Sequence, residues 1–161
     1  MNVRFMDTSI IMNLLEIPHM CAEAENIKKE FGKAVQDGEV LILPMSTIIE
    51  SGNHIAHIVK GDIRREKAMK FQEFLKKTAE ESAPWIFYGA EFTKEDLYNL
   101  AEEFPDKALT LPMGIGDMSI IQSYKKYKET IPAVGRIMIW STDVNLSEFK
   151  EEFTMKRRKN R

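Results

Sequence analysis

Four acidic residues occupy positions from which an α/β protein could build a metal site. Asp7 and Asp143 each follow an apolar run of strand length, while Glu50 and Asp117 each lie near the start of a predicted helix. Ligands of open α/β sheets bind at the edge where the carboxyl ends of the parallel strands lie. Carboxylates gathered there repel one another, and Mg²⁺ or Mn²⁺, which prefers oxygen ligands, would relieve that repulsion. The four acids therefore predict a centre that could activate water against a phosphate ester.

Each acid also has a purely structural explanation. Asp7 can cap the helix that follows it, Asp117 can cap its own helix, and Asp143 can form an Asx turn. Thr47 to Glu50 matches a capping box, in which the glutamate bonds the backbone amide of the capping residue. Taken singly, none of the four acids distinguishes a ligand from a cap, so the prediction of a site rests on all four together.

The elements that would position these acids alternate between strands and helices. Apolar runs of strand length and apolar residues at helical spacing define them. Strands are expected at 3–6, 39–43, 85–88 and 137–140, and helices at 8–16, 21–37, 47–60, 63–79, from Thr93 to Phe104-Pro105, and from Asp117 onward. This alternation predicts the α/β class, as a three-layer α/β/α sandwich with a mainly parallel central sheet.

The charge of the chain is unevenly distributed. The 161 residues carry a formal charge of −2, but residues 156–161 hold five basic residues and no acid, which leaves −7 on residues 1–155. We therefore expect one domain over residues 1–153 and a basic tail, solvated rather than bound to RNA, over residues 154–161. The chain has no signal-peptide pattern and no apolar stretch of the about 20 residues that span a membrane, so a cytoplasmic protein is expected.

The order and spacing of four short motifs resemble the PIN-domain ribonucleases, most nearly their VapC-like toxin branch. The motifs are Asp7-Thr8-Ser9 after the first strand, Glu50 in a mid-chain helix, Gly116-Asp117 opening a late helix, and Thr142-Asp143 followed by Phe149. The resemblance implies a Mg²⁺- or Mn²⁺-dependent endoribonuclease whose catalytic, metal-binding residues are the four acids. It also implies that Thr8, Ser9 and Thr142 support those acids. The partners it implies are an RNA substrate, an antitoxin protein and a second copy of the chain.

Asn53 and His54 lie about one helical turn beyond Glu50 and could contact phosphate or water if Glu50 points into the site. The alternative is that this polar stripe lies on a solvated helix face. A zinc site built from His19, Cys21, His54 and His57 would lack the paired spacing of zinc frameworks.

Two other functions fit parts of the sequence. Asn145 stands where PIN domains often carry a further acid, which favours a catalytically degenerate PIN-fold module that binds RNA or protein without cleavage. Haloacid-dehalogenase-type phosphohydrolases also begin with an aspartate at a strand end, but they need a second aspartate where this chain has Ser9. A P-loop triphosphatase is disfavoured because the sequence contains no Gly-x-x-x-x-Gly-Lys loop.

Overall fold

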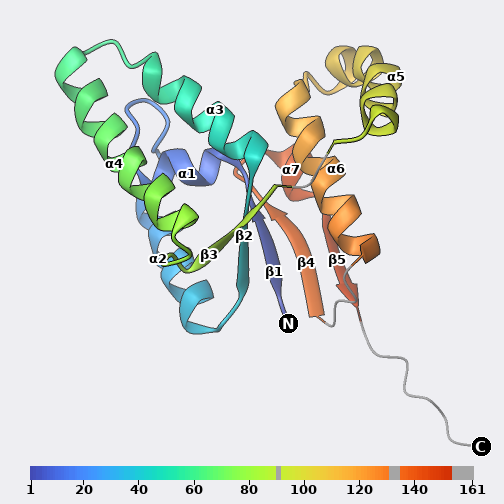
Figure 1. Cartoon of the computed structure of the whole chain (residues 1–161), viewed down its shortest axis with the longest axis horizontal. Helices are drawn as coiled ribbons and strands as arrows, with labels where there is room; N and C mark the ends of the chain where they lie inside the picture. Colours follow the sequence, from blue (N-terminus) through green and yellow to red (C-terminus); the bar gives the residue numbers. More distant parts are fainter. Residues whose placement is uncertain (90–91, 131–134, 154–161) are drawn as a thin grey trace, which may run out of the picture.

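The computed structural model describes residues 1–89, 92–130 and 135–153 (Figure 1). Its strands are β1 (Val3–Met6), β2 (Val40–Pro44), β3 (Trp85–Tyr88), β4 (Gly135–Trp140) and β5 (Lys150–Phe153). Its helices are α1 (Thr8–Leu14), α2 (Ala24–Gln36), α3 (Met45–Ala56), α4 (Gly61–Ala79), α5 (Lys94–Thr110), α6 (Ile115–Thr130) and α7 (Val144–Ser147). The predicted basic tail, residues 154–161, lies outside the described residues.

The strands form one mixed sheet in the order β3-β2-β1-β4-β5. β1 pairs in parallel with β2 and β4, and β2 pairs in parallel with β3, whereas β5 runs antiparallel to β4. The predicted α/β class and mainly parallel sheet are therefore confirmed. β5 was not predicted, because three of its four residues are charged and the strand lies at the edge of the sheet, where polar residues are tolerated.

Helices flank the sheet on both faces (Figure 1). Val3 and Phe5 of β1 pack in one core cluster with buried residues of α5 and α6, such as Leu100 and Tyr124. Met6 belongs to a second cluster, which contains buried residues of α1, α2, α3 and α4. Successive side chains of a strand point to opposite faces, so β1 is buried on both faces as a central parallel strand requires. This layering is consistent with a three-layer sandwich.

Several helix boundaries differ from the prediction; for example, α2 begins at Ala24 instead of residue 21, and α3 ends at Ala56 instead of residue 60. α5 continues through Pro105 to Thr110 instead of ending near Phe104-Pro105. Proline cannot donate a hydrogen bond to the carbonyl of Ala101, but Ala101 is exposed, so water can reach that carbonyl. α3 begins at Met45, directly after Pro44, so neither Ser46 nor Thr47 is its cap.

No helix in the described part of the chain is both long enough and apolar enough to cross a membrane.

Candidate metal centre

Asp7 is held at the carboxyl end of the central strand. Its backbone N–H donates to the carbonyl of Trp140 at 3.0 Å, and its side chain is only 6% exposed. Asp7 Oδ2 accepts hydrogen bonds from the hydroxyls of Ser9 at 2.9 Å and Ser141 at 2.8 Å, and from the Ser9 backbone N–H at 3.4 Å. The capping role expected of Asp7 is present, but it occupies Oδ2 alone. Among the described residues, Oδ1 has no hydrogen-bond donor.

Glu50 reaches the same place from α3. Thr47 does not cap this helix, because its buried hydroxyl donates to the carbonyl of Met6 at 2.7 Å and so fastens α3 to the end of β1. Glu50 Oε2 instead accepts a hydrogen bond from the Thr8 hydroxyl at 3.0 Å. The capping-box explanation of Glu50 is therefore wrong, and Thr8 directs its carboxylate toward β1.

Asp117 comes from the first turn of α6, where Gly116 controls how closely α6 approaches α3. A β-carbon added at Gly116 would lie 1.5 Å from Glu50 Oε1, so the Glu50 carboxylate occupies the space that any other residue would fill. Asp117 Oδ2 accepts a long hydrogen bond, 3.4 Å, from the backbone N–H of Gly114. Gly116 thus allows Glu50 and Asp117 to share one small volume.

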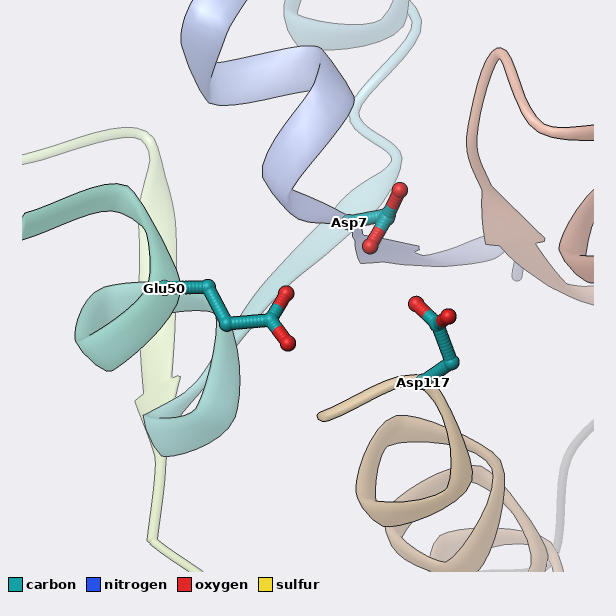
Figure 2. A group of neighbouring side chains, drawn as sticks. All are labelled: Asp7, Glu50 and Asp117. Atoms are coloured by element: carbon teal, nitrogen blue, oxygen red, sulfur yellow. The ribbon is translucent and has the colours of Figure 1, made fainter. Parts of the chain in front are cut away.

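The carboxylates of Asp7, Glu50 and Asp117 point toward one another (Figure 2). One oxygen of each lies within 4.8 Å of the others, and this is the one grouping of three or more histidine, cysteine or acidic side chains at such distances among the described residues. Within the same part of the chain, none of the ion pairs involves these three acids. The cluster therefore has negative charge without a counterion among the described residues.

Burial and the electrostatic repulsion within the cluster raise the pKa of Asp117. Burial and the negative charges of Asp7 and Glu50 raise the pKa of Asp117 from 3.8 to about 6, against the lowering effect of the Gly114 N–H. The charge of Asp143 adds a smaller increase to that pKa. A carboxylate whose ionisation is resisted in this way is stabilised by a proton or by a bound cation.

Asp143 lies apart from the three clustered acids. It is exposed, it is the N-cap of α7, and its Oδ1 accepts a hydrogen bond from the Asn145 N–H at 2.7 Å. The structure thus brings together three of the four acids expected from the sequence, and Asp143 keeps the turn-forming role that was its structural alternative.

The supporting residues differ in how close they lie to the cluster. Thr8 and Ser9 contact Glu50 and Asp7 directly. Thr142 contributes its backbone N–H, which donates to Ser9 Oγ at 3.0 Å, while its side chain is exposed. Asn53 and His54 are exposed on α3, and no hydrogen bond among the described residues joins their side chains to the acids.

Ser141 is the contact that sequence reasoning missed. Its hydroxyl donates to Asp7 and lies 3.3 Å from Ser9 Oγ, so two serines hold one carboxylate oxygen. The available signal was its position as the first residue after β4, a strand expected to end at the same edge of the sheet as β1.

The donor set of the cluster has a clear chemical preference. The three carboxylates offer only oxygen, and no histidine or cysteine of the described residues joins them, which suits Mg²⁺ or Mn²⁺ better than zinc. Asp7, Glu50 and Asp117 therefore fit the kind of cation predicted from the sequence.

No known protein-family model matches the sequence, and no curated protein matches it either.

Proposed function

We propose that this protein is a metal-dependent endoribonuclease with a PIN-like fold. The observation that carries the proposal is the convergence of Asp7, Glu50 and Asp117, from three separate elements, on one volume in which the described residues supply no counterion. Asp7 follows the central strand of a mainly parallel sheet, at the edge where α/β proteins bind their ligands.

Each residue of the centre has a distinct task in this proposal. Asp7, Glu50 and Asp117 would hold a Mg²⁺ or Mn²⁺ ion, while the Ser9 and Ser141 hydroxyls hold Oδ2 of Asp7 and leave its Oδ1 available as a ligand. Thr8 orients Glu50 in the same way. The bound cation supplies activation of water and neutralisation of charge on the scissile phosphate. Because its pKa is near 6, the Asp117 carboxyl group is mostly ionised at pH 7 and would be available as a ligand.

The substrate and the physiological role rest on the resemblance to PIN domains. RNA is the proposed substrate, and a VapC-like role adds an antitoxin partner that suppresses the activity. Expression of the active protein should then arrest growth, whereas the Asp7→Asn variant should not. Normal growth with the active protein would favour a processing nuclease over a toxin.

The enzymatic proposal is tested with purified protein and single-stranded RNA. We expect cleavage with Mg²⁺ or Mn²⁺, no cleavage with EDTA, and loss of cleavage in Asp7→Asn and in Asp117→Asn. Mn²⁺ binding by the same variants shows whether the ion is lost, and circular dichroism shows whether the fold is retained. Cleavage that persists in EDTA, or in both variants, would refute the mechanism.

One observation favours a second candidate, a degenerate PIN-fold module that binds RNA or protein without cleaving it. Asp143 lies outside the cluster, and the side chain of Asn145 donates to the carbonyl of Leu111 at 3.3 Å instead of completing the acidic group. This candidate predicts RNA binding that is unchanged by Asp7→Asn and independent of divalent ions, with no cleavage under any condition.

A further inference from the structure

A groove of about 1000 Å³ lies between α5, α6 and the segment that joins α7 to β5. Its apolar wall includes Met118, Ile121 and Phe149, while much of its remaining lining is charged. The lining contains three lysines and seven acidic residues, which are Lys107, Lys125, Lys126, Glu95, Asp96, Glu102, Glu103, Asp106, Glu129 and Glu148. Negative groups therefore outnumber positive groups by four in this one groove.

Most of these acids have no cation beside them. Asp96 pairs with Lys126, but none of the other six acids takes part in an ion pair within the described part of the chain. Water stabilises one exposed carboxylate well enough. Several carboxylates in one groove also repel one another, because exposed charges interact over about 8–10 Å at moderate ionic strength. A segment with several positive charges would relieve that repulsion.

A segment of matching charge follows β5 in the chain. Residues 156–161 hold five basic residues and no acid, and they lie outside the described residues. The described chain leads to them through Phe153, which pairs with Gly135 of β4. Glu151 of the same strand pairs with Lys128 of α6 at 2.6 Å. The end of β5 therefore lies beside the last turn of α6.

The same turn of α6 forms one end of the groove. Met118 is the first α6 residue in the groove lining and Glu129 is the last. The distance between them along the helix axis is about 17 Å, at a rise of about 1.5 Å per residue. Residues 154–161 span up to about 26–29 Å when extended. They are thus long enough to turn at the end of β5 and to follow α6 along the groove.

We propose that residues 154–161 bind in the groove between α5 and α6, where their basic side chains pair with the acids of its lining. Charge complementarity and the place at which the segment leaves β5 both favour this occupant. A covalently attached segment also has an effective concentration of about millimolar, which favours it over a separate cationic ligand of equal affinity. This inference does not depend on the metal centre or on an RNA substrate.

The proposal differs from the solvated tail expected from composition alone. One ion pair between exposed side chains contributes little, so binding of the segment requires several pairs at once. Added salt screens such pairs and should release the segment from the groove. At low salt, the same pairs would keep these basic residues from the phosphates of RNA.

Paramagnetic labelling of the full chain tests where the segment binds. A nitroxide is attached at Asn160→Cys in a Cys21→Ser background, which removes the only native cysteine. At about 50 mM salt the label should broaden the NMR signals of groove residues, such as the side-chain amides of Asn99 and Gln122. This broadening should be lost at about 0.5 M salt, where charges are screened over a few ångströms.

Charge variants identify the acids that bind the segment. The triple variant Glu102→Gln, Glu103→Gln, Asp106→Asn removes three exposed carboxylates from the groove and should reduce the broadening at least about threefold. The matched control is Asp62→Asn, Glu73→Gln, Glu80→Gln, which removes the same charge from exposed sites along α4 and at its C-cap. α4 and α6 pack in different core clusters, on opposite faces of the sheet, so the control should leave the broadening unchanged. Circular dichroism verifies the fold of both variants.

Disulfide formation tests the same contact without a label. In the Cys21→Ser background, Asn160→Cys should form an internal disulfide with Asn99→Cys in the groove at least about 10-fold faster than with Gln72→Cys on α4. Groove signals that stay sharp at low salt would overturn the proposal. So would broadening that survives the three groove substitutions, broadening that appears only when single-stranded RNA is added, or equal rates of disulfide formation.

Discussion

Asp7 and Asp143 occupy nearly equivalent places in neighbouring parallel strands, yet their surroundings differ. Each follows a strand, each is the N-cap of the next helix, and each accepts a backbone N–H from the residue two positions on. Asp7 is buried among acids, while Asp143 is exposed and outside the group. An aspartate that caps a helix can therefore lie either inside the acidic cluster or outside it.

The register of the sheet explains the difference. Met6 pairs with Trp140, so the residue level with Asp7 on the neighbouring strand is Ser141, and Asp143 lies two positions beyond. Ser141 uses this place to donate to Asp7 and to accept the N–H of Asp143 at 3.0 Å. The serine thus holds Asp7 in the cluster and ties the backbone of Asp143 into the turn.

The largest expected difference between the two aspartates appears when the charge of each is removed in turn. Asp7→Asn should lower the rate of RNA cleavage by about 10³-fold or more, because it removes a ligand whose orientation is already fixed. Asp143→Asn should lower that rate by no more than about 10-fold, through its longer-range field alone. Rates at saturating Mn²⁺ measure both. Equal losses in the two variants would mean that Asp143 joins the centre when the ion binds.

A smaller effect on Mn²⁺ binding should follow from displacing a carboxylate of the cluster without mutating any of the acids. A methyl group at Gly116 displaces the Glu50 carboxylate, so Gly116→Ala should weaken Mn²⁺ binding by about 10–100-fold. Gly114→Ala is the matched control, because a β-carbon there meets no atom within 4 Å. Titration calorimetry gives both affinities. The expectation fails if the two variants bind Mn²⁺ alike.

The pKa of Asp117 should respond differently to neutralising Asp7 and to neutralising Asp143. Neutralising Asp7 should lower the pKa of Asp117 from about 6 by more than neutralising Asp143 does, since Asp7 contributes more to the increase. Carboxyl chemical shifts of the metal-free protein, followed by NMR, give this pKa directly. A larger shift in Asp143→Asn would contradict the arrangement of the cluster.

The Asp117 carboxyl group should make the free energy of unfolding depend on pH. Because the pKa of Asp117 is higher in the folded protein than its ordinary value of 3.8, protonation favours the fold. This contribution is complete below about pH 4 and is lost as the pH rises through about 6. Asp117→Asn should therefore raise the free energy of unfolding of the metal-free protein at pH 7 by about 1 kcal/mol, and by less at pH 4. Denaturant unfolding at both values measures the difference.

The smallest effect should come from the two residues after β4. Ser141→Ala removes a hydroxyl that holds Asp7 Oδ2, and we expect cleavage to fall by about 3–10-fold and stability by about 1 kcal/mol. Thr142→Ala should change neither, because Thr142 contributes only its backbone N–H to Ser9. Kinetics and thermal unfolding of the pair report both quantities. Equal effects of Ser141→Ala and Thr142→Ala would contradict a role of the Ser141 hydroxyl in the metal centre.

Most of the fold could be predicted from sequence because its strands are apolar runs separated by helices of clear periodicity. β1, β2, β3 and β4 were all expected within one or two residues of their observed bounds. β5 was missed because its polar residues do not distinguish an edge strand from a loop. α5 was expected to end near Pro105 because proline usually ends a helix. The helix continues because Ala101, whose carbonyl loses its partner at Pro105, is exposed to water, and that exposure depends on the tertiary structure.

The candidate site was less predictable because it depends on register and on close approach. Sequence position placed Asp7 at the end of its strand and Asp117 in the first turn of its helix, whereas Glu50, expected near a helix start, lies in the middle of α3. The position of Asp143 along the sheet relative to Asp7 depends on which residues of β1 and β4 pair. That register cannot be predicted from the sequence of either strand alone. The role of Ser141 depends on the same pairing, and the function of Gly116 follows from the position of Glu50, 66 residues earlier in the chain.

A crystal structure of the protein soaked in Mn²⁺, with the ion located by its anomalous scattering, tests the central claim most directly. We predict an ion bound by carboxylate oxygens of Asp7, Glu50 and Asp117, at the about 2.0–2.3 Å typical of such cations, with Ser9 and Ser141 still bonded to Asp7 Oδ2. An ion bound elsewhere, or no ion among these three carboxylates at millimolar Mn²⁺, would contradict the assignment of this cluster as a metal centre.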